Sequence, residues 1–191
     1  MIKGFEDTIE WYNQNAKQYA DTVREMSVQE RINAFTSTLR PGSKILDAGC
    51  GGGRDAALLT NLGFELVGLD VSSGLIEEAK RSHPEIHFQV GNFLEIDFMD
   101  GEFDGLWSWA SLVHLETIED VKQALSEFNR VLKKGGTVLV VVKAQKGSEK
   151  TAVVSDSFSD KDRFFRYFEP QELKQLMSNS GFSELDFEHY R

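Results

Sequence analysis

Apolar and polar positions alternate between strand-length runs and helix-length segments over most of the chain. The runs are short and rich in Val, Ile and Leu, and the segments between them carry apolar residues at every third or fourth position. This pattern predicts strands at residues 44–48, 64–69, 86–90, 103–108 and 137–143, and helices at residues 54–62, 73–82, 117–132 and 171–179. Such alternation predicts an α/β fold with a doubly wound, mostly parallel sheet and helices on both faces.

The remaining segments extend this pattern at both ends. Helical spacing of apolar residues predicts two helices before the first strand, at residues 5–20 and 29–39. The valine run at residues 138–142 does not alternate with polar residues, which is typical of a strand buried on both faces. The Lys-Lys-Gly-Gly stretch at residues 133–136 suits a helix end followed by a turn. The polar residues 144–162 are expected to form a mobile loop or insertion.

Three glycines occupy alternate positions in the turn after the first predicted strand: Gly49, Gly51 and Gly53. They lack the Cβ atoms that would keep a ligand away from the main chain, and nucleotide-like ligands bind at such turns in open α/β sheets. The dinucleotide pattern G-x-G-x-x-G is not met, because its third glycine would fall on Arg54. Asp47 precedes the glycines, and its carboxylate suits a positively charged ligand group better than a pyrophosphate.

The segment KILDAGCGGGRD at residues 44–55 resembles the first motif of class I methyltransferases that use S-adenosyl-L-methionine (SAM). SAM carries an ammonium and a sulfonium, so an acid beside its methionine half is electrostatically favourable. The next predicted strand ends in Asp70, about twenty residues further on, where Rossmann-like sheets place an acid on the ribose hydroxyls. The resemblance implies a SAM-dependent methyltransferase that releases S-adenosyl-L-homocysteine.

Two other classes of protein stay open at this point. A SAM-binding protein without transfer activity, acting as a sensor or a partner subunit, fits the same motifs. A nicotinamide-dependent oxidoreductase is disfavoured by Arg54 in place of the third glycine and by Asp47.

The resemblance implies cofactor contacts at the ends of the predicted strands and in the first helix: Asp47, Gly49, Cys50, Gly51, Gly53, Arg54, Asp70, Val71, Asn92, Phe93, Trp109 and Tyr19. Asn92 would accept a hydrogen bond from the adenine amino group, and Val71 would pack on one face of the ring. The alternative roles are a helix cap for Asp70, a turn residue for Asn92 and a small turn-filling residue for Cys50.

The stretch after the fourth predicted strand resembles the family's segment that lines the reaction centre. His114 is the candidate general base, because an imidazole titrates near neutral pH; a structural histidine that caps the next helix is the alternative. The candidate acceptor contacts are Tyr12, Ser111, Arg163 and Arg166. Tyr12 and Tyr19 lie seven residues apart on one helix face, and aromatic core packing is their alternative role. Trp107 is expected in the core.

The resemblance also bears on the two ends of the chain. Residues 1–40 are expected to form a helical lid over the cofactor, and residues 41–191 the SAM-binding domain with which the lid makes one globular unit. The family usually ends with two further strands, the last one antiparallel, whereas residues 185–190 supply one candidate strand. Three alternatives follow: the sequence is cut short, residues 163–168 supply a strand, or the sheet has six strands.

Composition limits the classes of substrate and partner that this chain is expected to bind. The net charge of -10 and the pI near 4.9 disfavour nucleic acid as substrate, since phosphate contacts need a basic face. A small-molecule acceptor is therefore expected, with no membrane partner, because no apolar run approaches the length of a membrane span. The single Cys50 suits the cytoplasm, and no metal-ligand spacing is visible. We expect a monomer or a homodimer.

Overall fold

The computed structural model describes residues 4–155 and 161–188. Its centre is a five-stranded sheet with the order β3-β2-β1-β4-β5, in which every neighbouring pair is parallel. The strands are β1 (Lys44–Ala48), β2 (Glu65–Asp70), β3 (His87–Val90), β4 (Phe103–Trp109) and β5 (Leu132–Val141). The helices are α1 (Phe5–Val23), α2 (Gln29–Thr36), α3 (Arg54–Asn61), α4 (Ser73–Ser82), α5 (Ile118–Val131) and α6 (Pro170–Asn179), with a 3-10 turn η1 (Leu112–His114).

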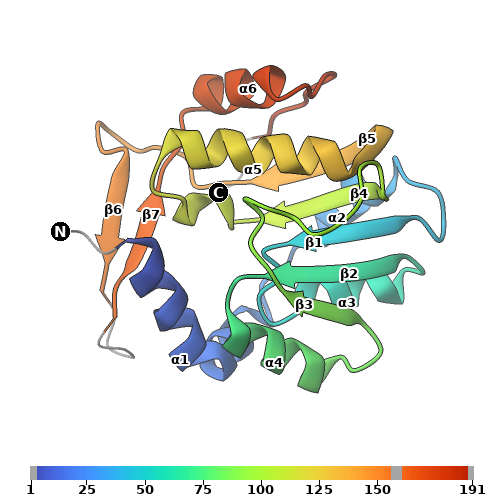
Figure 1. Ribbon diagram of the computed structural model, residues 1–191, viewed down its shortest axis with the longest axis horizontal. Helices are drawn as coiled ribbons and strands as arrows, with labels where there is room; N and C mark the ends of the chain where they lie inside the picture. The colour runs from blue at the N-terminus through green and yellow to red at the C-terminus, as the bar shows by residue number, and fades with distance from the viewer. Residues whose placement is uncertain (1–3, 156–160, 189–191) are drawn as a thin grey trace.

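Side-chain alternation along β1 divides the core between the two faces of the sheet. Ile45 packs with residues of α2, α3 and α4, whereas Leu46 and Ala48 pack with α5 and α6. Successive side chains of a strand point to opposite faces, so each face is covered by its own helices (Figure 1). The predicted doubly wound α/β class is confirmed, and the predicted strands and helices are found with shifted ends; α1 is longer and α2 shorter than expected.

A separate two-stranded antiparallel sheet is formed by β6 (Thr151–Val154) and β7 (Arg163–Arg166). The expectation that residues 144–162 form only a loop is therefore wrong for β6; residues 156–160 of that stretch lie outside the described residues. Residues 163–166 do supply a strand, but it pairs with β6 instead of β5. Phe164 and Phe165 are buried, so packing of these rings holds the hairpin against the main body.

The end of the α5–β5 unit differs from the prediction. Helix α5 ends at Val131 and β5 begins at the next residue, so the Lys-Lys-Gly-Gly stretch bulges within the strand instead of forming a separate turn. Pairing with β4 shifts between Phe103 and Gly105, which accommodates the extra residues.

The expected burial of β5 on both faces is also wrong. Residues 138–140 are only half-buried, because no described strand pairs with the second edge of β5. Residues 185–188 of the predicted last strand form no strand, and residues 189 and 190 lie outside the described residues.

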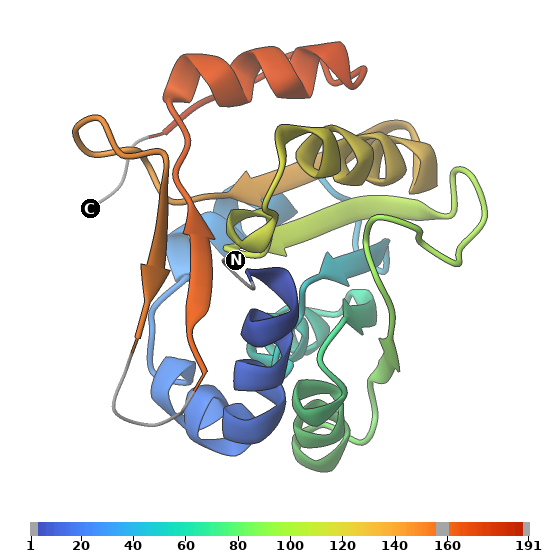
Figure 2. The same ribbon diagram turned by 60° about the vertical axis from the view of Figure 1, so that its left-hand side comes forward.

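The strand order creates a crossing point at β1. The chain leaves β1 toward β2 and β3, then returns to β4 on the other side of β1, so the carboxyl ends of these strands meet where ligands of open α/β sheets bind. The strand arrows point toward α1 and the β6–β7 hairpin (Figure 1). Figure 2 shows α1 lying between that hairpin and α4. Helix α1 therefore covers the edge of the sheet where the predicted site lies.

One buried hydrogen bond joins β4 to the start of α3 near this edge of the sheet. The indole Nε1–H of Trp107 donates to Asp55 Oδ2 at 2.9 Å, and Trp107 is completely buried, as expected of a core residue. Asp55 is the second residue of α3, and the bond therefore ties that helix to β4.

Replacing Trp107 by Phe should lower the free energy of unfolding by about 1–3 kcal/mol, because one oxygen of a buried carboxylate loses its donor. Urea unfolding would measure this as a lower midpoint with an unchanged slope. The control is Tyr167→Phe, which removes a hydroxyl with no hydrogen bond among the described residues. A loss no larger than that of Tyr167→Phe would show that the indole bond does not stabilise the fold.

Candidate active site

The glycine loop is held against the end of β2 by its own amide groups. Gly49 N and Cys50 N both donate to the carbonyl of Leu69, at 2.8 and 3.1 Å. Gly51 N donates to Asp70 Oδ2 at 2.9 Å, so the loop is hydrogen-bonded to the acid at the end of β2. Gly49 has φ +84°, and a Cβ there would lie 2.3 Å from Ser111 Cβ. The loop therefore requires glycine at position 49 for both its backbone angle and its close approach to Ser111.

A cavity of about 390 Å³ lies beside this loop. Asp47 lines it together with six other predicted cofactor residues: Tyr19, Gly49, Cys50, Gly51, Arg54 and Trp109. The side chain of Cys50 itself is buried, and burial, then the charge of Asp47, raises the pKa of its thiol. A thiol in that state is a poor nucleophile, which supports the role of a small turn-filling residue.

Asp47 is the most unusual residue of the cavity. It is 2% exposed, and its Oδ2 has no hydrogen-bond partner among the described residues. Burial, followed by the charges of Asp55 and Asp70, holds its pKa well above the usual range. A buried carboxyl oxygen without a donor is costly unless a ligand supplies one. Asp47 is therefore suited to a cationic, hydrogen-bonding ligand group.

Arg54 brings the opposite charge to the same cavity. Its Nε donates to Asp55 Oδ1 at 2.5 Å, and its Nη1 donates to the carbonyl of Val23 at 3.0 Å. The first residue of α3 is thereby fastened to the end of α1. The cavity thus offers a carboxyl group and a guanidinium to a ligand that carries both charges.

Asp70 is buried at the end of β2, where its oxygens accept from Gly51 N and from Ser72 N, each at 2.9 Å. Burial raises its pKa, and these backbone donors oppose that rise. Ser72, and not Asp70, caps the N-terminus of α4: its hydroxyl accepts from Leu75 N at 3.2 Å.

Helix α1 lies over Asp70. Asn13 Oδ1 accepts from the Ser72 hydroxyl at 2.8 Å and from Gly74 N at 3.1 Å. The rings of Tyr12 and Tyr19 are 4.9 Å apart. Burial, then the charge of Tyr19 for Tyr12 and of Asp70 for Tyr19, raises the pKa of both hydroxyls. Asn13 was missed from the sequence, although a polar side chain on the buried side of an amphipathic helix was a usable signal.

Two of the predicted adenine contacts have other roles in this arrangement. Asn92 Oδ1 accepts from Leu94 N at 2.9 Å, a local turn that agrees with the alternative reading of this residue. Phe93 is buried in the core, with its ring 6.0 Å from that of Phe128. Val71 is half-buried beside Asp70. The adenine contacts of Asn92, Phe93 and Val71 therefore stay predictions.

The segment after β4 joins several elements by its side chains. Ser111 Oγ donates to the carbonyl of Ala48 at 3.1 Å and lies 2.5 Å from Ser108 Oγ. This buried hydroxyl is already bonded to β1, which disfavours a contact between Ser111 and the acceptor. The predicted acceptor contact of Ser111 therefore stays a prediction. Trp109 stacks on Trp107 at 5.7 Å between ring centres and reaches the cavity.

His114 lies between α1 and β7. Its Nδ1 is 2.8 Å from the carbonyl oxygen of Phe164, and its Nε2 is 3.0 Å from the Tyr12 hydroxyl. A carbonyl oxygen only accepts, so Nδ1 carries the hydrogen and Nε2 accepts from Tyr12. Burial, and to a lesser degree the charges of Arg163 and Lys143, lowers the pKa of His114 to about 4. The imidazole is therefore neutral near pH 7, and its lone pair is already occupied.

The two predicted arginines are separated by the strand that carries them. Arg166 Nε donates to the carbonyl of Leu115 at 3.1 Å and Nη2 donates to the carbonyl of Glu116, which fastens β7 to the segment after η1. The guanidinium carbon of Arg163 lies 4.0 Å from the centre of the Trp11 ring. The structure brings Arg163 close to Tyr12 and His114, and engages Arg166 elsewhere.

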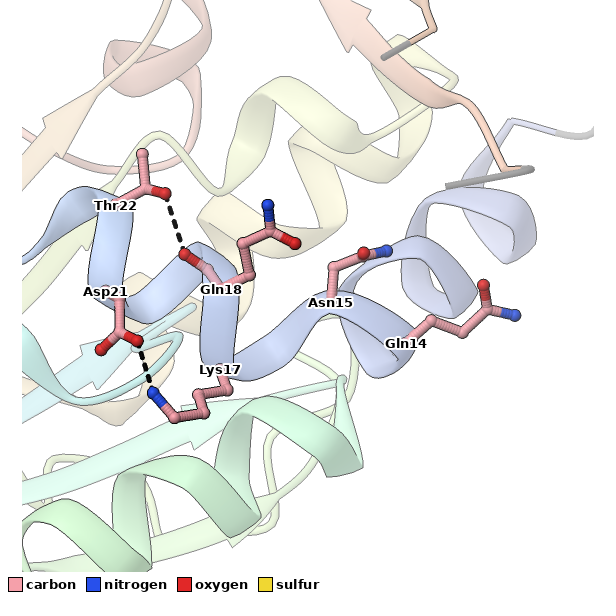
Figure 3. Close-up of a pocket in the computed structure, with 6 residues that line it drawn as sticks. All are labelled: Gln14, Asn15, Lys17, Gln18, Asp21 and Thr22. Carbon is pink, nitrogen blue, oxygen red and sulfur yellow. Dashed lines mark hydrogen bonds and ion pairs between the residues drawn. The ribbon is translucent and has the colours of Figure 1, made fainter. Parts of the chain in front are cut away.

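A second, shallow hollow lies along α1 and is lined only by polar residues of that helix (Figure 3). It follows the kink at Asn15, whose Nδ2 donates to the carbonyl of Trp11 at 2.8 Å. Bonds between Lys17 and Asp21 and between Thr22 and the Gln18 carbonyl cross it. It contains none of the predicted site residues.

Residues 4–155 and 161–188 contain neither a membrane-spanning helix nor a metal-binding cluster. No helix in these ranges is long and apolar enough to cross a membrane. No group of three or more His, Cys, Asp or Glu side chains in the same ranges is arranged to hold a metal ion.

The glycine loop, the acids at two strand ends and the adjoining cavity define a nucleotide-type site on a Rossmann-like sheet. The family model described as "Methyltransferase domain" matches residues 46–140. A protein of Encephalitozoon cuniculi that bears a provisional methyltransferase name is 30% identical over 201 residues, covering 96% of this chain and 91% of that protein. The O-methyltransferase resE of Aspergillus sclerotiorum is 26% identical over 198 residues, covering 100% of this chain and 73% of its own.

One solved structure extends the comparison to three dimensions. It is the 1,6-didemethyltoxoflavin-N1-methyltransferase of Burkholderia thailandensis, with bound 1,6-didemethyltoxoflavin and S-adenosylhomocysteine. Its TM-score is 0.74 at 20% identity, covering 95% of this chain and 79% of that chain, which shows a shared fold.

The chain therefore belongs to the class I SAM-dependent methyltransferases, and SAM is its cofactor. The predicted family, enzyme class and cofactor are confirmed. The matches favour methyl transfer over a SAM-binding protein without activity and over a nicotinamide-dependent oxidoreductase.

His114 makes the stability of this protein depend on pH. Its pKa is lowered from about 6.5 in the unfolded chain to about 4 in the folded chain, so the unfolded state binds the proton more tightly. The contribution is complete above pH 6.5 and is lost as the pH falls toward 4, on the order of 3 kcal/mol in total. Wild type and His114→Gln should therefore converge in free energy of unfolding across this window.

The measurement is urea unfolding of both proteins at several pH values, taken as a difference. The difference removes the opposite contribution of Asp47 and Asp70, whose raised pKa values make acid less destabilising. Parallel curves for the two proteins would contradict a buried neutral imidazole.

Proposed function

We propose that this methyltransferase binds the methionine half of SAM in the cavity beside the glycine loop and transfers its methyl group to a small-molecule acceptor. The observation that carries the proposal is Asp47 Oδ2, which has no hydrogen-bond partner within residues 4–155 and 161–188 and is buried in a cavity that Arg54 also lines. A ligand ammonium would supply the missing donor to Asp47, and a ligand carboxylate would lie beside the Arg54 guanidinium, whose Nε and Nη1 are already bonded within the protein. The glycine loop adds a close main-chain surface, because Gly49 and Gly51 have positive φ and no side chain.

Asp70 would hold the ribose hydroxyls. Its position at the end of the strand next to β1 supports this role, as does its anchoring by two backbone donors. In the described structure α1 lies above it, with Asn13 bonded to the start of α4. Cofactor entry would therefore require α1 to shift.

Bound SAM supplies an activated methyl group on its sulfonium. The chain then has to align the acceptor and exclude water, a proximity effect of about 7–11 kcal/mol in favourable cases. Helix α1 would close the site from above, and the segment from Trp109 to His114 would form its floor. A general base is optional for such a reaction.

His114 would act as that base only after Tyr12 gives up its bond to Nε2. Tyr12 belongs to α1, so a shift of the helix on cofactor or acceptor binding would free the lone pair. With Tyr12 in place, His114 instead fixes α1 and β7 to the segment after β4.

A small molecule is the proposed acceptor. The net charge of -10 repels a polyanion, and phosphate contacts dominate the affinity for nucleic acids. The O-methyltransferase relative and the structural neighbour with bound 1,6-didemethyltoxoflavin agree with such an acceptor. The buried unpaired Cys50 agrees with a cytoplasmic location.

Asp70→Ala should weaken the binding of S-adenosylhomocysteine by about 1.5–3 kcal/mol, the contribution of a hydrogen bond to a charged group. Titration calorimetry on protein checked for its native circular dichroism spectrum would measure it. Asp97→Ala is the matched control, since this exposed acid lies outside the glycine loop and does not line the cavity. Unchanged affinity in the Asp70 variant would place the ribose elsewhere.

Hydrogen exchange should slow in residues 5–20 when S-adenosylhomocysteine binds, because α1 would close over the ligand. Asn13→Ala should increase exchange of this segment in the free protein, since the helix loses its bonds to α4. Gln18→Ala, on the exposed side of α1, should not. Equal protection with and without ligand would argue that α1 is a fixed part of the core.

A further inference from the structure

Asp55, which was not among the predicted site residues, holds Arg54 at the wall of the cofactor cavity. Its Oδ1 accepts from Arg54 Nε at 2.5 Å, and its Oδ2 accepts from Trp107 Nε1 at 2.9 Å. Asp55 is buried and Trp107 is completely buried in β4. The carboxylate is therefore held at both oxygens, one by a core strand and the other by the arginine.

The bonds of Arg54 leave one guanidinium nitrogen for a ligand. Nε is bonded to Asp55, and Nη1 donates to the carbonyl of Val23 at 3.0 Å. Nη2 forms no hydrogen bond within residues 4–155 and 161–188. Because a guanidinium is planar and rigid, holding Nε and Nη1 also sets the direction of the N–H groups on Nη2. Arg54 lines the cavity beside the glycine loop, so this donor belongs to the same site.

Asp55 also offsets the cost of burying the arginine. The side chains of Arg54 and Asp55 are 16% and 8% exposed. Burial by itself lowers the pKa of Arg54, but the hydrogen bond and the charge of Asp55 outweigh it, so the pKa is raised. The two charges largely cancel at a distance. A ligand carboxylate therefore gains from Arg54 mainly through directed hydrogen bonds, which depend on how the guanidinium is oriented.

The charge of Asp55 has an opposing effect on the same ligand group. Burial, and then the charge of Asp55, raises the pKa of Asp47, so this charge acts on groups across the cavity. It would also repel a ligand carboxylate bound beside Arg54. Removing the charge would therefore weaken carboxylate binding if orientation of Arg54 dominates, and strengthen it if repulsion dominates. The sign of the change separates the two effects.

We propose that Asp55 is a positioning residue for the cofactor, which by fixing the Arg54 guanidinium makes the site select ligands with a carboxylate on the methionine half. This inference rests on the proposed function and deepens it. Asp55 acts through Arg54, and Trp107 holds Asp55 from the core. The bond from Arg54 to the Val23 carbonyl extends the same arrangement to the end of α1.

The test compares two ligands that differ only in the carboxylate. S-adenosylhomocysteine carries it, whereas decarboxylated S-adenosylhomocysteine lacks it and keeps the ammonium. Titration calorimetry gives the Kd of each ligand, and the measured quantity is the selectivity, the Kd of the decarboxylated ligand divided by that of S-adenosylhomocysteine. Partial unfolding weakens both ligands by the same factor, so a purely structural role of Asp55 would leave the selectivity unchanged.

The variants are Arg54→Gln, Asp55→Asn, the double variant and Arg54→Lys. The control is Val121→Ala, which lowers stability from a buried position in α5 that does not line the cavity. It should keep the wild-type selectivity while unfolding at lower urea concentration.

The wild type should favour the ligand with the carboxylate, and Arg54→Gln should lower the selectivity by roughly 10- to 100-fold. Asp55→Asn should remove most of the same selectivity, and should lower it no further when Arg54 is already replaced. Arg54→Lys keeps the charge but has no planar fork to bond Asp55, Val23 and a ligand together, so it should also lose most of the selectivity. This variant leaves the buried Asp55 side chain in place and decides the matter if Asp55→Asn does not fold.

An unchanged selectivity in Asp55→Asn, a rise caused by lost repulsion, or full wild-type selectivity in Arg54→Lys would overturn the positioning role. The control by Arg54→Gln separates this failure from that of the proposed function. If Arg54→Gln lowers the selectivity and Asp55→Asn does not, only the role of Asp55 is wrong. If Arg54→Gln leaves it unchanged, the carboxylate lies elsewhere, and both the proposed placement of the methionine half and this inference fail.

Discussion

The amide groups of the glycine loop hold the end of β2, and this arrangement decides where every other part of the site can lie. Gly49 N and Cys50 N bond the Leu69 carbonyl, and Gly51 N bonds Asp70. The loop cannot rise from the sheet without breaking these bonds, and a side chain at position 49 would collide with Ser111. The cavity, the two acids and the start of α3 are therefore positioned by one short turn.

Hydrogen bonds fasten helix α1 to several neighbouring elements, in addition to the bond between Arg54 of α3 and the Val23 carbonyl. Thr8 Oγ1 accepts from Phe164 N at 2.9 Å in β7, Tyr12 bonds His114 after β4, and Asn13 bonds the start of α4. Each of these hydrogen bonds contributes about 0.5–1.5 kcal/mol net, and Asn13 makes two of them. Displacing this helix as a cover over a cofactor would break these bonds and also expose the buried side chains of Trp11, Ala16 and Ala20.

Charge is distributed unevenly around the site. The acids Asp47 and Asp70 lie at the ends of β1 and β2, where the proposed site would hold the ammonium and the ribose of SAM. Lys143 and Arg163 lie over the rings of Phe165 and Trp11, in a chain with a net charge of -10. His114 lies between α1 and these cations, so its protonation is sensitive to what binds beside it.

The fold class, the glycine loop and the pair of acids at two strand ends were determined by the sequence, because each depends on local spacing. Strand period, helix period and the angles open to glycine are properties of neighbouring residues. The hairpin of β6 and β7, the edge position of β5 and the separate roles of Arg163 and Arg166 were decided only by the tertiary structure. These features depend on which surfaces pack together over long separations along the chain. The same holds for Asn13, whose bonds to Ser72 and Gly74 depend on the packing of α4 beside α1.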